Sequence, residues 1–347
     1  MSKKRVAVAL SGGVDSSMTA CLLKESGYDV IGITMHLWSD ADQNCPSFAS
    51  IEDAENTCRK LGIPFNLIDL ESDFYHRVIE YFCNEYARGR TPNPCIVCNR
   101  DIKFGSLLKR AESLGADFLA TGHYARVKRQ DNRYHLLKGR DTTKDQSYML
   151  YTLGQNKLRR VLYPLGDYTK SEIRELARQK DMPAAGKPSS QDICFIASDY
   201  GAFISQYITA SPGDVVDGSG KILGGHRGTT YYTIGQRHGL GLATTEPLYV
   251  TCIDADKNRI IVGPKEELYR SRLMADQVNW ISGTPPAQQL EVTVKIRYRS
   301  PDIAATLYPA MNSAEVSFEQ PQPAITPGQA VVFYQDEEVI GGGTIES

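Results

Sequence analysis

Two stretches of this 347-residue chain hold residue types that could do chemistry. The first is Ser11-Gly12-Gly13-Val14-Asp15-Ser16-Ser17, where the glycines let the backbone approach a phosphate closely and the serine hydroxyls add hydrogen-bond donors. The second is the basic stretch 88–100, which contains Cys95 and Cys98 as a CxxC pair. Such a pair can bind zinc or an iron–sulfur cluster, act as a redox pair or supply a thiol nucleophile.

The elements around the first stretch favour a phosphate site. Val6 to Leu10 is a short apolar run, typical of a strand buried on both faces of a parallel sheet. Apolar residues then recur at helical spacing from Met18, and Gly27 ends this predicted helix. A strand, a glycine turn and a helix N-terminus in that order bind anions, because free N–H groups and the helix dipole point at the ligand. A carboxylate beside phosphates is repulsive, so Asp15 either faces a Mg²⁺ ion or holds the loop.

The glycine loop matches neither of the two common nucleotide loops. It lacks the Lys-Ser/Thr of a Walker loop, and it contains no GxGxxG. SGGVDSS instead resembles the PP-loop of the N-type ATP pyrophosphatases, which cut ATP between the α and β phosphates to activate a substrate as its adenylate. The resemblance implies ATP and Mg²⁺ as ligands.

Alternating strand and helix patterns up to residue 204 predict an α/β fold with a Rossmann-like parallel sheet. Residues 39–50 are predicted to be a polar loop, and 88–103 to be irregular, since prolines and a glycine interrupt regular elements. Other expected elements are strands at 30–35, 64–70 and 118–120, helices at 51–61, 74–86, 104–114 and 170–179, and a hairpin at 125–138 around Asp131-Asn132.

Beyond about residue 210, short β runs and glycine turns replace the helical pattern. Residues 231–239 mix aromatics, cations and glycine, as RNA-contacting surfaces and ordinary polar turns both do. Val292, Val294 and Ile296 alternate with polar and basic residues, which predicts a strand with one apolar face. We therefore expect three domains: a PP-loop catalytic domain (1–204), a small central β-rich domain (205–272) and a C-terminal β-barrel (273–347).

Composition excludes several other classes. Contents of 41% hydrophobic and 23% charged residues are ordinary for a soluble globular protein. No apolar run approaches the length of a membrane span, and the basic N-terminus leads straight into a strand, so we expect a cytoplasmic protein without a membrane partner. Eight cysteines are too sparse for a disulfide scaffold. With a net charge of −2, a nucleic-acid partner must be held by local basic patches.

Seven segments in collinear order give a more specific resemblance. The chain resembles the tRNA-specific 2-thiouridylases, which convert the wobble uridine of certain tRNAs to 2-thiouridine with ATP and a persulfide sulfur. The implied partners are tRNA and a persulfide donor protein, such as a cysteine desulfurase or a relay carrier. The segments are SGGVDSS, TPNPCIVCNRDIKF, ATGHYAR, KDQSYMLYTL, SQDICF, YYTIGQRHGLG and TPGQAVVFY.

The resemblance also implies a role for individual positions. Cys98 matches the first catalytic cysteine and Cys194 the one that carries the persulfide. The implied ATP-binding residues are Ala9, Leu10, Ser11, Gly12, Gly13, Val14, Asp15, Ser16, Met35 and Gly122. The implied tRNA-binding residues are Asn93, Pro94 and Cys95 at the target base, and His123, Lys144, Asp145, Gln146, Arg297, Tyr298 and Gln329 elsewhere. A packing role for His123 stays equally open on the residues alone.

The sequence departs from the better-known family pattern at one position. That pattern has DxxC where this chain has Cys95 and Cys98, so an aspartate that could act as base is absent. Cys95, Cys98 and Cys194 could instead hold three corners of a 4Fe–4S cluster whose open iron binds sulfide. The persulfide pair is the primary expectation and the cluster its alternative.

Two other classes share some of these features. Another PP-loop ATP pyrophosphatase that makes an amide or a guanidine would use the same ATP loop but has no need for paired cysteines. A non-catalytic RNA-binding protein with a relic ATP loop would release no pyrophosphate. Turnover by a Cys98→Ser variant would favour the amide- or guanidine-forming enzyme. Failure to release pyrophosphate with any tRNA would favour the non-catalytic RNA-binding protein.

Overall fold

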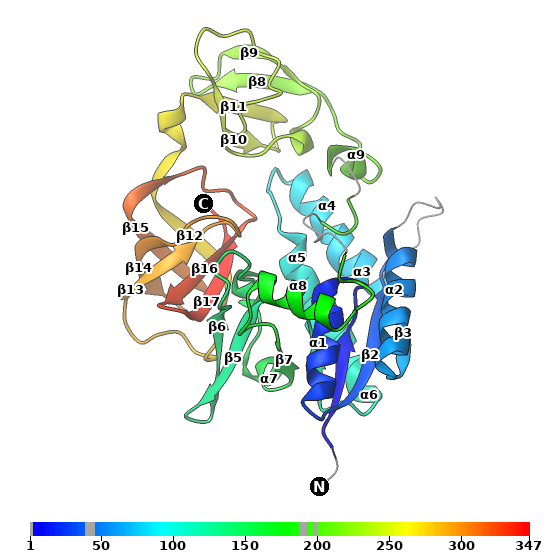
Figure 1. Cartoon of the computed structure of the whole chain (residues 1–347). Coiled ribbons are helices and arrows are strands. Elements are labelled where there is room, and N and C mark those ends of the chain that lie inside the picture. Colours follow the sequence, from blue (N-terminus) through cyan, green and yellow to red (C-terminus); the bar gives the residue numbers. More distant parts are fainter. Residues whose placement is uncertain (1–2, 39–45, 187–192, 197–199) are drawn as a thin grey trace.

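Five parallel strands form the sheet of the N-terminal part of the chain (Figure 1). The computed structural model describes residues 3–38, 46–186, 193–196 and 200–347. The strand order is β3-β2-β1-β4-β7, and every neighbouring pair is parallel. The predicted α/β class with a Rossmann-like sheet is confirmed. These strands are β1 (Arg5–Ala9), β2 (Asp29–His36), β3 (Phe65–Asp69), β4 (Phe118–Ala120) and β7 (Val161–Leu162).

Helices cover both faces of this sheet. On one face, α1 (Val14–Glu25) and α2 (Pro46–Leu61) pack against Val6 and Val8 of β1. On the other face, the helical segments between residues 71 and 113 pack against Ala7 and Ile33. Helix α8 (Lys170–Gln179) packs against α1. The remaining helices are α3 (Glu71–Phe74), η1 (Tyr75–Ile79), α4 (Glu80–Ala87), α5 (Pro94–Val97), η2 (Cys98–Leu107), α6 (Leu108–Ser113), η3 (Ser147–Leu150), α7 (Gln155–Leu158) and α9 (Tyr200–Ile204).

The structure contradicts part of the prediction for two loops. The stretch 88–103 was expected to be irregular, but α5 begins at Pro94 and the π-helical turns of η2 continue it to α6. Proline is tolerated at the first position of a helix, where its missing N–H has no helical partner. The expected 39–50 loop is also helical from Pro46 onward, while 39–45 lie outside the described residues.

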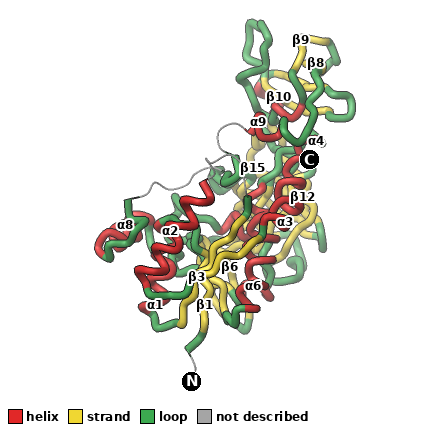
Figure 2. The backbone as a smooth tube through the Cα atoms, turned by 90° about the vertical axis from the view of Figure 1, so that its right-hand side faces the viewer, coloured by secondary structure: helices red, strands yellow, loops and turns green. Residues whose placement is uncertain are grey.

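The central β-rich part has its own four-stranded sheet and core. Its strand order is β10-β11-β8-β9, in which only β11 and β8 run parallel. Val215, Val250 and Ile260 form the centre of its core. Its elements are β8 (Gly213–Asp217), β9 (Ile222–His226), η4 (Thr229–Tyr231), β10 (Tyr249–Asp254), β11 (Arg259–Gly263) and η5 (Lys265–Leu268). Figure 2 shows this sheet at one end of the molecule and the N-terminus at the other.

The C-terminal part is a closed antiparallel barrel, as predicted. The strands run β12-β15-β14-β13-β16-β17, and a β12–β17 pairing closes the ring. They are β12 (Tyr269–Trp280), β13 (Leu290–Lys295), β14 (Ile303–Pro309), β15 (Ser313–Pro323), β16 (Ala330–Gln335) and β17 (Glu338–Ile345). Val292, Val294 and Ile296 point into its core, which confirms the apolar face.

A hairpin from the N-terminal part extends the barrel sheet. Strands β5 (Ala125–Gln130) and β6 (Arg133–Lys138) form the predicted hairpin, with Asp131 and Asn132 at φ of 49° and 61° in its turn. β6 then pairs with β17, so residues far apart in the chain share one sheet. No helix in the described ranges is long and apolar enough to cross a lipid bilayer.

Candidate functional site

The glycine loop connects the carboxyl end of β1 to the N-terminus of α1, as predicted. Gly12 has a φ of 72°, and Gly13 precedes the first residue of α1. Ser16 Oγ accepts a hydrogen bond from the Ser11 N–H at 3.1 Å and donates to the Gly13 carbonyl at 3.1 Å. The serine hydroxyls thus hold the loop in shape. The first N–H groups of α1 have no partner within the helix and are therefore available to bind an anion.

Two glycines allow close packing around this loop. A Cβ at Gly12 would lie 2.6 Å from the Ser50 carbonyl oxygen of α2. A Cβ at Gly122, just after β4, would lie 3.0 Å from the backbone of Asp15 and Ser16. A side chain at Gly12 would therefore displace the backbone of α2, and one at Gly122 would displace the backbone at the start of α1.

Asp15 holds the loop to the rest of the domain. Both of its carboxylate oxygens lie within hydrogen-bond distance of Lys170 Nζ, at 2.5 and 2.6 Å, and Tyr124 donates its hydroxyl to one of them at 2.8 Å. Lys170 is the first residue of α8, which therefore docks on α1 through this ion pair. Of the two roles that the sequence left open for Asp15, this is the structural one.

The CxxC pair lies on α5 and η2. Asn93 caps α5 by accepting a hydrogen bond from the Cys95 N–H at 3.2 Å, and Pro94 is the first residue of the helix. Cys95 is half-buried and Cys98 is buried. Cys194, 96 residues further along the chain, is exposed.

Charges on Cys95 and Cys194 affect the pKa of Cys98, which places the three cysteines in one region of the fold. Burial raises the pKa of Cys98 to about 12; Lys103 lowers it, and the charges of Cys194 and Cys95 raise it further. Although the residue Cys194 is exposed, the protein around its thiol removes hydration and so raises its pKa to about 11, with Cys95 as the next cause. Burial also raises the pKa of Cys95. All three are therefore thiols rather than thiolates at neutral pH in the free protein.

The residues just before the cysteines contact the other two parts of the chain. The Thr91 N–H donates to the Pro327 carbonyl at 2.9 Å, and Gln329 Nε2 donates to the Thr91 carbonyl at 2.8 Å. Arg90 pairs with Glu85 at 2.7 Å and with Glu346 at 2.6 Å. From the central part, Ile253 lies 2.7 Å from where a Gly89 Cβ would be. The cysteine helix is thus anchored where all three parts of the chain meet.

The expected tRNA residues after β6 differ in exposure. Lys144 is exposed. Asp145 is buried and accepts hydrogen bonds from the Gly139 N–H at 2.9 Å and from the Ser147 hydroxyl at 2.8 Å. Gln146 Oε1 accepts a hydrogen bond from the Tyr124 N–H at 3.0 Å. Asp145 and Gln146 therefore fix the backbone that presents Lys144.

His123 is buried in this structure. Its Nδ1 lies 2.7 Å from Thr121 Oγ1, and its ring packs between Phe104 and Tyr163. Burial, with Lys103 as a second cause, holds its pKa well below the usual value. The imidazole is therefore neutral at physiological pH.

Arg297 and Tyr298 follow β13 at the edge of the barrel that faces the N-terminal part. Arg297 donates to the carbonyls of Pro323 and Ala324. Tyr298 packs against Tyr148 at 6.0 Å between ring centroids, and burial raises its pKa, with Asp145 and then Cys95 as further causes. Tyr298 thus lies near the cysteine site.

One group of metal-ligating side chains lies at the carboxyl ends of β2 and β3. Ligand atoms of His36, Asp69 and Glu71 lie within 4.8 Å of one another. Such acidic groups are common on surfaces, and His36 and Glu71 have further interactions, so this cluster by itself defines no metal site.

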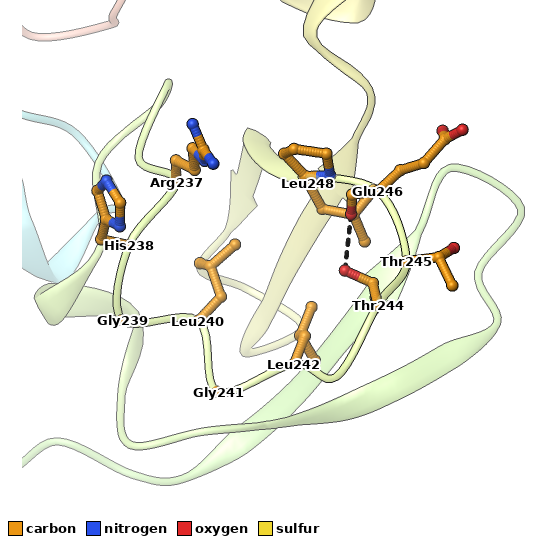
Figure 3. Close-up of a pocket in the computed structure, with 11 residues that line it drawn as sticks. Arg237, His238, Gly239, Leu240, Gly241, Leu242, Thr244, Thr245, Glu246 and Leu248 are labelled. Atoms are coloured by element: carbon orange, nitrogen blue, oxygen red, sulfur yellow. Dashed lines mark hydrogen bonds between the residues drawn. The ribbon is translucent and has the colours of Figure 1, made fainter.

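Two surface cavities lie away from these residues. The first, of about 360 Å³, is lined by 237–242 and 244–248 of the central part (Figure 3). There Thr244 Oγ1 donates to the Glu246 carbonyl at 2.7 Å, and Leu240 and Leu242 lie along the loop. The second is lined by α8 residues with Arg140 and Tyr168. Neither contains an expected site residue.

Comparison with known proteins decides the family. Residues 4–198 match the tRNA methyl transferase HUP domain family, 201–264 the PRC-barrel domain of that group, and 270–345 the aminomethyltransferase β-barrel domain. The tRNA-specific 2-thiouridylase MnmA of Natranaerobius thermophilus is 47% identical over 99% of this chain and 98% of its own. That of Moorella thermoacetica is 49% identical over 98% and 99%. The chain belongs to the tRNA-specific 2-thiouridylase family. The match runs along the whole chain and so includes the cysteine region as well as the ATP loop.

Among solved structures, the U34-tRNA thiolase NcsA from Methanococcus maripaludis with its [4Fe-4S] cluster is 20% identical. It covers 58% of this chain and 63% of its own with a TM-score of 0.36, which is too low to transfer the cluster.

Several residues that organise the site have roles that were not predicted. Lys170 and Tyr124 hold Asp15, Arg90 joins Glu346, and Lys103 is the cation among the cysteines. Lys170, Tyr124 and Arg90 each contact a residue far away in the chain, whereas Lys103 is close in sequence to Cys98. A lysine five residues after a CxxC cysteine is the one signal that sequence could have offered.

Proposed function

We propose that this protein thiolates tRNA: it adenylates C2–O of the wobble uridine with ATP and then transfers sulfur to C2. One observation supports this proposal most strongly. The chain, a member of the 2-thiouridylase family, has a glycine loop suited to phosphate and, on a separate helical segment, Cys95 and Cys98 in the same region as Cys194. Adenylation needs the first feature, and sulfur transfer needs the second.

In the first step the C2 oxygen of uracil attacks the α-phosphorus of ATP, and pyrophosphate leaves. C2–O is a poor leaving group, and the adenylate makes it a good one. The loop from Ala9 to Ser16 would bind the phosphates through backbone N–H groups, with Met35 and Gly122 beside the nucleotide. Because both Asp15 oxygens face Lys170, Mg²⁺ is assigned to the phosphates.

In the second step a persulfide on Cys194 supplies the sulfur. Its terminal sulfur bonds to C2, and AMP departs with the former C2 oxygen. Cys98 then attacks Sγ of Cys194; the S–S bond breaks, its electrons stay on the transferred sulfur, and a Cys98–Cys194 disulfide forms. A thiol reductant must return two electrons to this disulfide before the next turnover. The persulfide donor is a separate protein with a sulfane sulfur on cysteine.

The tRNA would lie between the N-terminal part and the barrel. Asn93, Pro94 and Cys95 begin the cysteine helix and are assigned to the target base, which must leave the anticodon stack. Lys144, Arg297 and Tyr298 are assigned to the surrounding nucleotides. Asp145, Gln146, Gln329 and His123 are assigned to positioning these contacts, because each bonds or packs within the protein.

We place the domain boundaries at 1–204, 205–272 and 273–347. The separate sheets support this division, and the family matches at 4–198, 201–264 and 270–345 fit it. The β5–β6 hairpin belongs to the first domain by sequence and to the barrel sheet by pairing.

The test separates the two chemical steps. Each variant is mixed with ATP, Mg²⁺, a persulfide donor and tRNA that lacks 2-thiouridine, and both pyrophosphate and 2-thiouridine are measured. Cys98→Ser and Cys194→Ser are expected to release pyrophosphate and form no 2-thiouridine. Cys83→Ser, which changes another buried thiol, and Cys252→Ser, which changes another exposed one, are the controls and should thiolate normally. Full thiolation by Cys98→Ser would overturn the sulfur-transfer assignment.

The mutual influence of three cysteines favours one second candidate. Cys95, Cys98 and Cys194 have the donor chemistry to hold a 4Fe–4S cluster, which would supply an open iron position for sulfide. Iron and acid-labile sulfide in anaerobically prepared wild type, lost in Cys95→Asp, would support it. Full activity of iron-free protein with a persulfide donor would contradict it.

A further inference from the structure

The β5–β6 hairpin is the most basic element of the N-terminal part of the fold. Its residues 125–138 include five lysines and arginines, one histidine and a single acidic residue, in a chain whose net charge is −2. Figure 1 shows it projecting beside the barrel, away from the parallel sheet. None of the residues that we assign to ATP or tRNA lies in this hairpin.

The two faces of the hairpin differ. Val127, Tyr134 and Leu136 pack against the main core, so this face is covered. Strand alternation and the register of the hairpin, in which Lys128 pairs with His135, place Arg126, Lys128, Arg133 and His135 on the opposite, solvent-facing side. Three of the five lysines and arginines, together with His135, thus lie on the open face, while Arg129 and Lys138 lie on the side of Tyr134.

Only part of this charge is neutralised within the protein. Arg126 pairs with Glu337 at 2.8 Å, and His135 pairs with Glu338 at 2.7 Å. Lys128 and Arg133 are exposed, and they have no ion pair within the part of the chain that the structure describes. Arg129, also exposed, stacks over Tyr134 at 5.9 Å and points its guanidinium to the hairpin turn at Asn132.

The root of the hairpin lies between the two protein segments assigned to tRNA. On one side, Tyr124 and Gly139 bond to Gln146 and Asp145. On the other, Lys138 pairs with Asp302 at 2.6 Å, four residues beyond Tyr298. A polyanion bound at residues 144–146 and 297–298 would therefore meet the hairpin next.

We propose that the solvent face of the β5–β6 hairpin binds phosphates of the tRNA through Lys128 and Arg133, with Arg129 at its tip. This inference rests on the proposed function. It extends the tRNA interface from the cysteine site along the hairpin, and it assigns these contacts to backbone positioning rather than to reading bases. Affinity should change, and the chemistry on the bound base should not.

The test measures tRNA affinity against salt for Lys128→Gln/Arg133→Gln. Each lost phosphate contact lowers the slope of log K against log salt by roughly 0.9 at most, so the slope should fall by about 1.5, with roughly tenfold weaker binding at about 0.1 M salt. The control, Lys109→Gln/Arg110→Gln, removes two exposed cations from α6 and keeps the net charge change equal. The control should bind tRNA as wild type does. At saturating tRNA, all three proteins should thiolate at the same rate.

Two results would overturn the proposal. One is an unchanged slope and affinity in the hairpin variant, which would assign its charges to keeping the edge strand β5 from pairing with other chains. The other is an equal loss of affinity in the α6 control, which would show only a dependence on net charge. Failure of the proposed function is separate, because the wild-type protein would then form no 2-thiouridine, whatever its affinity for tRNA.

Discussion

Arg90, which precedes the cysteine helix, pairs with Glu346, the residue that follows the last strand of the barrel. The guanidinium contacts both carboxylate oxygens, at 2.6 and 2.8 Å, across 256 positions of the chain. Arg90 lies five residues before Cys95 and also pairs with Glu85 of α4. The C-terminal barrel therefore helps to set where the cysteines stand relative to the ATP loop.

Breaking this pair should slow sulfur transfer more than adenylation. In Glu346→Gln one carboxylate is lost, while Glu85 still holds Arg90. We expect the free energy of unfolding to fall by about 1–2 kcal/mol. 2-Thiouridine formation should slow several-fold while the rate of pyrophosphate release stays near that of wild type. The control is Glu315→Gln, which removes the carboxylate that pairs with the exposed Arg272 on the same barrel. Equal slowing of both steps would argue against a positioning role.

The Asp15–Lys170 pair should show energetic coupling. Lys170 is buried, so Asp15→Asn leaves an ammonium without a counter-charge and should destabilise the protein by about 3 kcal/mol. Asp15→Asn/Lys170→Met should cost less than the two single changes added together. Urea unfolding of the four proteins measures this. Strict additivity would mean that the pair does not tie α8 to α1.

The cysteine thiols should need alkaline pH to react. With a pKa of about 11, the thiolate fraction of Cys194 rises about tenfold per pH unit from pH 7 to 10. Alkylation of Cys194 by iodoacetamide, followed by peptide mass spectrometry, should rise in proportion. Because this pKa is raised, the folded protein favours the neutral thiol of Cys194. The stability of the folded state that this preference provides is present below pH 9 and is lost as the pH rises through 11. A plateau in the alkylation rate below pH 9 would be inconsistent with this environment.

A side chain at Gly122 should disturb the start of α1 and weaken ATP binding. In Gly122→Ala the added Cβ would lie 3.0 Å from the backbone of Asp15 and Ser16, so the start of α1 must shift. We expect a loss of about 1–3 kcal/mol in unfolding free energy and a raised KM for ATP. Gly154→Ala is the matched control, because no atom lies within 4 Å of its new Cβ. An unaltered KM for ATP in Gly122→Ala would place the nucleotide elsewhere.

Local patterns were enough to predict the elements of the nucleotide site. The strand at β1, the glycine turn and α1 follow one another directly, and the Asp131-Asn132 turn identifies its own hairpin. Proline misled the prediction at Pro94 because the same residue breaks a helix in its interior and begins one at its first position.

The arrangement of the site depends on long-range partners that no local pattern encodes. The pairing of β6 with β17 joins segments about 200 residues apart, and Lys170 meets Asp15 across 155 positions. Whether Asp15 faced a metal or held the loop was open for this reason. Because 96 residues separate Cys98 from Cys194, no local pattern predicts that they lie near each other. Only the family resemblance suggested it.

The central claim is tested most directly by nucleoside mass spectrometry of tRNA. Unthiolated tRNA is incubated with the protein, ATP, Mg²⁺ and a persulfide donor, then digested. The account predicts 2-thiouridine at the wobble position, with one AMP and one pyrophosphate formed per 2-thiouridine. Release of AMP and pyrophosphate with the uridine unchanged, or with an amine in place of sulfur, would contradict it.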